Sequence, residues 1–252
     1  MAPFIPGVLT YGCASVQDIL NMKVPLDFNQ DLSDPNSDYF RLQAAMGWQI
    51  RTTDPPTLRQ FLTRVRRAPD PDGKRFRYLD LNSEALGWLV EAVTNEPLRL
   101  HIANLVDAAG LEGALHLSCD RMGVPSLSSG ACLSGRDAAR FFLLIARGGD
   151  GVNGRTAGSA GFLDRTRRAS DAATINEGCC RYSNHFVVHR DLLMHTGWGG
   201  HVAWADPETG VAGVLLSVLT DPQVDESQHL HVLRHDVAEI SKSPLVRRTT
   251  PG

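Results

Sequence analysis

A tyrosine and two polar residues stand at alternate positions in the segment FRYLDLN, just before a helical pattern. Alternate side chains of an extended segment project to the same side, so Tyr78, Asp80 and Asn82 could line one wall of a cleft. A half-buried tyrosine that ends a strand gives the same pattern, and the residues alone favour this structural interpretation.

A second polar segment, Met194 to Gly200, reads MHTGWGG and is followed by HVAWADPETG. Glycines at the edge of a strand let a ligand approach the backbone closely, and the polar edge can bond a carbonyl or carboxylate group. The segment therefore offers a second candidate binding surface. A glycine-rich β-turn without a ligand explains it equally well.

Metal-binding signals are weak. His231 and His235 are four residues apart on an expected helix, but no nearby carboxylate or cysteine completes a ligand set. His195 with His201 is equally unconvincing as a metal pair. G-x-S-x-G, H-E-x-x-H, phosphate-loop and C-x-x-C motifs are all missing from the sequence. We therefore expect no metal and no other cofactor.

Composition limits the partners. Twenty-five basic and 28 acidic residues give a net charge of −3, which does not indicate a surface for nucleic acid or a membrane. A small-molecule substrate fits better. Five cysteines, with Cys179 and Cys180 adjacent, form an odd set that is poorly suited to bridging. Together with the missing signal-peptide pattern, this favours reduced thiols and a cytoplasmic location.

The helices and strands that would position these residues are predicted from the periodicity of the apolar residues and from helix-capping and turn residues. Helices are expected from Ser15, over 39–48, over 58–65, from Ser134 to Gly148, and over 228–240. A further helix is expected after an N-cap at Ser83, with Leu86, Leu89, Val90 and Val93 on one apolar face. Strands are expected over 185–189, 201–206 and 210–219, and loops over 27–38 and 165–173. Helices first and antiparallel strands last predict an α+β fold. We expect one domain over 1–252, with a helical lobe over roughly 15–175 and a sheet portion over roughly 180–252.

Taken in order, the segments resemble the β-lactamase and penicillin-binding-protein superfamily of serine hydrolases, and most of all its esterase and 6-aminohexanoate-dimer hydrolase branch. The segment 11–22 is similar to the family's LL-M-TSG helix region. Segments 76–98, 120–149 and 195–217 resemble the Y-x-S strand and its helix, the S-x-RD helix, and the K-T-G or H-x-G strand. His195 stands where many relatives carry lysine.

The resemblance implies an antiparallel sheet flanked by helices plus a helical lobe, and acyl transfer from an amide, ester or β-lactam. It makes Tyr78 the general base and acid, with Asp80 as its polar partner. His195 and Thr196 would border the substrate. Gly197, Trp198 and Gly199 would form the edge strand beside it. We further expect Tyr78, Asp80, Asn82, His195 and Trp198 to meet in one cleft.

The family's nucleophile motif, S-x-x-K, is missing. The lysines are Lys23, Lys74 and Lys242, and the residues three positions earlier are Leu20, Pro71 and Glu239. The sequence therefore resembles a family member truncated before that motif, without the serine helix and the first strands. We expect self-association through the uncovered sheet edge. The alternative to a hydrolase is an inactive remnant or a ligand-binding protein of the same fold.

Overall fold

The computed structural model describes residues 4–5, 7–48, 54–69, 75–170, 172–175, 180–218, 236–237 and 239–243. The chain forms two compact units. The first, which we call the helical unit, comprises Met1–Ala103 and Leu115–Cys132. The second, the sheet unit, comprises Asn104–Ala114 and Leu133–Gly252. Each unit is therefore discontinuous in sequence, and each is described by itself.

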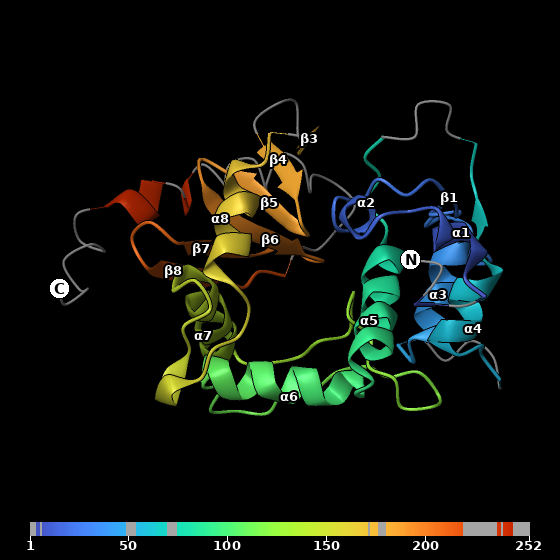
Figure 1. Cartoon of the computed structure of the whole chain (residues 1–252), viewed down its shortest axis with the longest axis horizontal. Coiled ribbons are helices and arrows are strands. Elements are labelled where there is room, and N and C mark those ends of the chain that lie inside the picture. Colours follow the sequence, from blue (N-terminus) through green and yellow to red (C-terminus); the bar gives the residue numbers. More distant parts are fainter. Residues whose placement is uncertain are drawn as a thin grey trace. The chain divides into compact units, whose positions relative to one another are not determined.

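Short helices dominate the helical unit (Figure 1). They are α1 (Leu9–Gly12), α2 (Val16–Leu20), α3 (Asp38–Ala45), α4 (Leu58–Arg64), α5 (Asp80–Thr94) and the first part of α6 (Leu98–Ala109). Strands β1 (Leu26–Asp27) and β2 (Arg66–Arg67) form a small antiparallel pair. Ser15 and Thr57 are the N-caps of α2 and α4, and each forms a capping box. The cap hydroxyl accepts a bond from the backbone N–H of the third helical residue, and the side chain of that residue accepts a bond from the backbone N–H of the cap.

The core of the helical unit forms around α5, which packs against α2 and α4. Ile19, Leu42, Leu62, Leu79 and Leu81 are all essentially buried in this cluster. Burial of that many aliphatic side chains is the dominant favourable contribution to the stability of the unit. Helix α5 is thus the element that the other helices hold in place.

The expected start and buried face of α5 were partly wrong. The helix begins at Asp80 with Leu79 as its N-cap, four residues before the expected N-cap at Ser83. Its buried side includes Leu81, Ala85 and Leu89, whereas Val90 and Val93 are exposed. Burial of Leu79 and Leu81 against the other helices decides the start, because no capping side chain marks it in the sequence.

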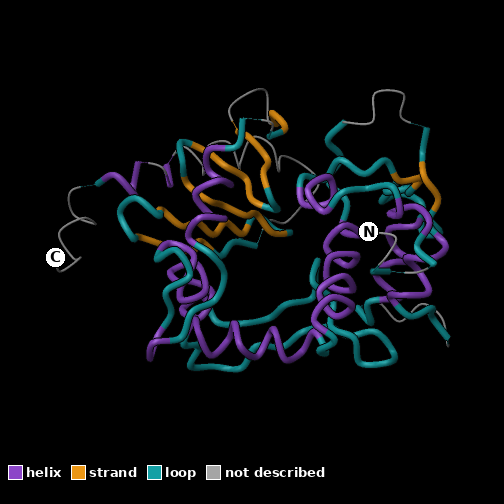
Figure 2. The backbone as a smooth tube through the Cα atoms, viewed as in Figure 1, coloured by secondary structure: helices purple, strands orange, loops and turns teal. Residues whose placement is uncertain are grey.

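The sheet unit contains the second half of α6, then α7 (Gly135–Ala146), the short η1 (Val152–Gly154) and α8 (Ala160–Arg168). Six strands follow: β3 (Ala173–Ile175), β4 (Cys180–Ser183), β5 (Phe186–His189), β6 (Leu192–Gly197), β7 (His201–Asp206) and β8 (Val211–Leu215). They pair antiparallel in sequence order, as a meander (Figure 2). The α+β class is confirmed.

Helices α7 and α8 cover one face of this sheet. Ile145 of α7 and Leu163 of α8 pack with Val188, Leu193 and Ala205 from three neighbouring strands. Because side chains alternate along a strand, the face that carries Leu193 and Ala205 also carries His195, Gly197, Ala203 and His201. The opposite face carries Trp204, whose indole N–H donates to the Ser241 hydroxyl.

One further expectation for this unit was wrong. Residues 165–168 belong to α8 rather than to a loop, because Leu163 and Thr166 are buried while Asp164 pairs with Arg167 and Arg168 on the outer side. Met194 to Gly197 lie in β6, as the resemblance to the K-T-G or H-x-G strand implies, and the glycine turn is confined to 198–200. The expected closing helix over 228–240 lies mostly outside the described residues.

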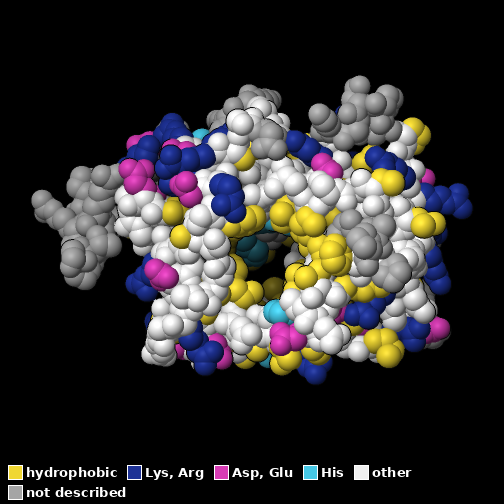
Figure 3. Space-filling model, viewed as in Figure 1, with side chains coloured by type: hydrophobic (Ala, Val, Ile, Leu, Met, Phe, Trp, Pro, Cys, Tyr) yellow, Lys and Arg dark blue, Asp and Glu magenta, His cyan; other side chains and the backbone are white. Residues whose placement is uncertain are grey.

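The surface of the described residues carries both signs of charge. In Figure 3, basic and acidic side chains are interspersed over the visible face. The four described cysteines, Cys13, Cys119, Cys132 and Cys180, form no disulfide with one another, and Cys179 lies outside the described residues. Within the described ranges, no helix combines the length and apolar character that crossing a membrane requires.

Candidate functional site

Tyr78 is fixed by its two sequence neighbours. The Arg77 guanidinium donates to the carbonyls of Leu26 and Phe28, at 3.0 and 2.6 Å, and the Leu79 side chain is completely buried. Between these anchors the Tyr78 side chain is 39% exposed. A phenol with a fixed backbone and an exposed side chain is placed to meet a substrate.

Asp80 and Asn82 lie in the first turn of α5, not in an extended segment. A helix turns by about 100° per residue, so positions 80 and 82 face different directions. The Asn82 side chain is 0% exposed, and its Nδ2 contacts the Met22 sulfur at 3.1 Å. The expectation that Asn82 lines a cleft wall is therefore wrong, because the fold places this amide in the core.

Asp80 is an unusually weak acid. Burial and, to a lesser extent, the nearby Glu84 carboxylate raise the pKa of Asp80 from 3.8 to about 6. The Asp80 charge in turn helps burial raise the pKa of Tyr39 on α3. Acids with a pKa near the working pH are effective proton donors and acceptors, so Asp80 is a candidate for proton exchange.

Glu84 was not singled out from the sequence. It lies one turn after Asp80 on the same helix, and it is buried. Its carboxylate accepts bonds from the hydroxyls of Ser126 and Ser128, at 2.8 and 2.7 Å, and from the backbone N–H groups of Leu127 and Ser128, at 3.1 and 3.0 Å. These bonds partly offset the rise in the pKa of Glu84 that burial causes. One feature of the sequence could have pointed to Glu84: Asp80 and Glu84 are two acids four residues apart, on a helix that contains no Lys or Arg.

His195 lies on β6 in the sheet unit. Its Nδ1 is 2.9 Å from the Thr196 carbonyl oxygen, which can only accept, so Nδ1 carries the proton of the neutral ring. Burial of the ring lowers the pKa of His195, and the bond to Thr196 only partly opposes this shift. The neutral imidazole therefore presents Nε2 as its basic nitrogen, where a lysine would present a positive charge.

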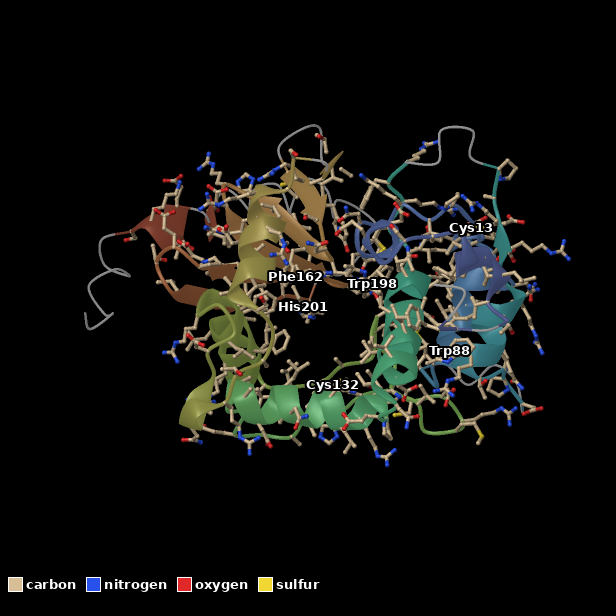
Figure 4. The ribbon with its side chains drawn as sticks, in the orientation of Figure 1. Cys13, Trp88, Cys132, Phe162, Trp198 and His201 are labelled. Atoms are coloured by element: carbon tan, nitrogen blue, oxygen red, sulfur yellow. The ribbon has the colours of Figure 1, made fainter. Side chains whose placement is uncertain are left out.

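The turn after β6 is tight and glycine-rich. Gly199 and Gly200 have φ of +85° and +86°, a conformation that glycine adopts without strain, and the Gly200 N–H donates to the Gly197 carbonyl at 3.2 Å. Trp198 projects from the turn and is 49% exposed (Figure 4). The expected edge strand is wrong, because β6 pairs with both β5 and β7, and Trp198 and Gly199 are turn residues.

The candidate residues divide between the two units. The helical unit carries Tyr78, Asp80 and Asn82, and the sheet unit carries His195, Thr196, Gly197, Trp198 and Gly199. The meeting of both groups in one cleft stays a prediction. Among the described residues no group of three or more His, Cys, Asp or Glu side chains is placed to hold a metal ion. His231 and His235 lie outside those residues.

Comparisons with known proteins agree on one family. The Beta-lactamase family model matches residues 9–237. The 6-aminohexanoate-dimer hydrolase of Paenarthrobacter ureafaciens is 27% identical over 241 residues, which is 90% of this chain and 59% of that protein. The chain thus spans well under two thirds of the length of this relative.

Two solved structures share the fold. A protein from Bacillus anthracis assigned as a 6-aminohexanoate-dimer hydrolase has a TM-score of 0.80 at 19% identity, over 96% of this chain and 66% of its own. EstCE1, a hydrolase with promiscuous acyltransferase activity, has a TM-score of 0.63 at 17% identity, over 94% and 76%. At these identities the similarity establishes a β-lactamase-like arrangement of helices and sheet.

Proposed function

Because this chain belongs to the Beta-lactamase family, we propose that it is a serine hydrolase that acts on ester or amide bonds by acyl transfer. The observation that carries the proposal is the anchored, exposed Tyr78, two residues before Asp80, whose pKa is raised to about 6. Family membership supports hydrolysis in general. The bond type, the acyl group and the residue roles are our proposal.

In this proposal Tyr78 moves the protons. A serine hydroxyl oxygen attacks the substrate carbonyl carbon while its proton passes to the basic form of Tyr78. Tyr78 then donates this proton to the departing alcohol or amine as the C–O or C–N bond breaks. Water attacks the acyl-enzyme in the same way, which releases a carboxylic acid and restores the serine. His195, Thr196 and the turn at Trp198 face the substrate, and backbone N–H groups stabilise the oxyanion.

A second candidate function is ligand binding without chemistry. It is favoured by a specific observation, which is that none of the three lysines follows a serine by three positions. A protein that kept the cleft but lost its nucleophile would bind acyl compounds and release them unchanged. The two candidates differ in whether a serine in this chain becomes acylated.

Covalent labelling separates these candidates. The 252-residue chain is incubated with a fluorophosphonate or with a fluorescent penicillin, and its intact mass is measured. The hydrolase proposal expects one added label per chain, and peptide mapping then identifies the serine. An unchanged mass, together with no release of p-nitrophenol from p-nitrophenyl acetate above the buffer rate, would leave ligand binding as the function. Small-molecule esters or amides remain the proposed partners, and the cytoplasm the proposed location.

A further inference from the structure

His201, the first residue of β7, stands opposite Gly197 of β6. A Cβ atom at Gly197 would lie 3.4 Å from the His201 Cβ and 3.5 Å from its Cδ2. These are ordinary van der Waals distances, so the imidazole lies directly beside Gly197. The Cδ2 edge of the ring therefore faces β6.

The other edge of the ring is held from the opposite side. The backbone N–H of Ser217, two residues beyond the end of β8, donates to Nδ1 of His201 at 3.1 Å. A nitrogen that accepts a hydrogen bond uses its lone pair, so the neutral ring carries its proton on Nε2. This tautomer is the reverse of that of His195, in which Nδ1 carries the proton.

These two contacts fix where the donor points. The Cδ2 flank of the ring, to which Nε2 is bonded, faces β6, and the Nδ1 flank faces the chain that leaves β8. The ring is half-buried, and no described residue accepts a hydrogen bond from Nε2. The Nε2 atom is not fully buried, so solvent can accept its hydrogen bond until an acceptor on a ligand replaces that solvent.

The surrounding residues connect this donor to the proposed site. His195 and His201 are diagonal neighbours on one sheet face, because His195 pairs with Ala203 and Gly197 pairs with His201. Such diagonal neighbours are about 7–8 Å apart, the span of a small acyl group. Trp198 projects from the turn that joins the two strands (Figure 4).

We propose that His201 is a specificity-determining residue whose Nε2–H donates to the carbonyl oxygen of the ester or amide substrate. The inference rests on the proposed function and adds a named donor for one atom of the substrate. A carbonyl oxygen offers the lone pairs that this donor needs. An ammonium group offers none, so ligands that present only a cation are not selected here.

The tautomer is measured first. Two-bond ¹H–¹⁵N correlation spectra of the full chain, with ¹⁵N-labelled histidine, are recorded at pH 8, and the His201 signals are assigned by their loss in His201→Gln. We expect Nε2 to show the shift of a protonated nitrogen and Nδ1 that of an unprotonated one. The reverse pattern would overturn the inference, because the tip would then carry no donor.

Ligand binding is measured next, with N-butylacetamide as a neutral amide probe and hexanoate as a carboxylate probe. We expect saturable shifts of the His201 signals with N-butylacetamide. His201→Phe should weaken binding roughly three- to tenfold, the scale of one hydrogen bond. His201→Gln keeps a distal N–H and should retain most of the affinity. His116→Gln, in the helical unit, is the matched control.

Each outcome decides something. Equal affinity of the wild-type chain and His201→Phe for both probes, or a lack of saturable binding, would overturn the role of His201. Circular dichroism of both variants excludes unfolding as the cause of a loss. The labelling experiment tests the hydrolase separately, so amide binding that depends on His201 without acylation would refute the enzyme and leave this donor in place.

Discussion

Tyr78 owes its position to its neighbours rather than to its own hydroxyl group. Arg77 holds two carbonyls of the β1 region, and Leu79 is buried in the core, so the residue between them has little freedom. A reacting side chain placed in this way loses little entropy when the substrate arrives. Its chemistry and its anchoring can therefore be tested separately.

If Tyr78 carries the proton transfer, Tyr78→Phe removes the hydroxyl and leaves both anchors in place. We expect kcat for ester hydrolysis to fall by about 10²–10⁴-fold, the usual effect of losing a general acid–base group, with an unchanged thermal midpoint. Tyr11→Phe is the matched control, because it removes a buried hydroxyl from the same unit. A decrease smaller than about tenfold would exclude Tyr78 from the chemistry.

Asp80 makes the stability of the protein depend on pH. An aspartate in the unfolded chain ionises near pH 4, whereas Asp80 in the folded chain ionises at about 6. Between these values the folded state keeps a proton that the unfolded state has lost, so the free energy of unfolding falls as the pH rises from about 4 to about 6.

Asp80→Asn abolishes this loss. The quantity to compare is the free energy of unfolding of the variant minus that of wild type. We expect this difference to be up to about 3 kcal/mol larger at pH 7.5 than at pH 4, the order of magnitude that a pKa shift of this size represents. Thermal unfolding followed at several pH values measures the difference. Asp54→Asn, at an exposed position, should show no such trend. A difference between Asp80→Asn and wild type that is the same at every pH would contradict the raised pKa.

At the scale of elements, the S-x-R-D segment has a structural role. The Asp137 carboxylate, in the first turn of α7, accepts bonds from the backbone N–H groups of Glu112 and Gly113, from the Ser134 hydroxyl and from Arg140. These donors keep the pKa of Asp137 below its usual range. The segment thus ties the start of α7 to the loop that follows α6.

Asp137→Ala should therefore loosen the sheet unit. We expect the thermal midpoint to fall by more than about 5 °C, because several N–H donors lose their acceptor together. Asp164→Ala, which removes an exposed pairing with Arg167 and Arg168, should change the midpoint by much less. Similar midpoints for the two variants would show that Asp137 does not anchor the loop.

Elements with local signals were predictable. Ser15 and Ser134 cap α2 and α7 as expected, because the N-cap hydroxyl bonds a residue three positions later in the chain. Helix α8 was not predictable from its many arginines, since its helical face is decided by contacts with β5. The donors around Glu84 come from residues 126–128, more than 40 positions away, so no local pattern could reveal that site.

At the scale of the molecule, the described part of the sheet has β8 as one of its edges. Beyond this strand Leu216 and Val218 are exposed, Val218 by 89%. Unpaired backbone groups beside exposed apolar residues favour association between copies. We expect the chain to elute from gel filtration above its 27.5 kDa monomer mass, increasingly so at higher concentration.

A lysine at this edge should oppose that association. We expect Val218→Lys to shift the elution towards the monomer, because a charge on the edge disfavours pairing with a second sheet. Val93→Lys places the same charge on the exposed side of α5 and should leave the elution unchanged. A monodisperse wild-type monomer at high concentration would refute the expectation for this edge.

The interleaving of the two units has a consequence for synthesis on the ribosome. Residues 1–103 emerge first, but the segment Leu115–Cys132, which supplies every donor to the Glu84 carboxylate, leaves only after Asn104–Ala114 of the other unit. The backbone N–H groups of Glu112 and Gly113 in that earlier segment can donate to Asp137 only after Asp137 has been synthesised. A nascent chain that ends before Ser126 therefore contains α5 with a buried carboxylate and none of its partners, which disfavours complete folding of the helical unit at that length.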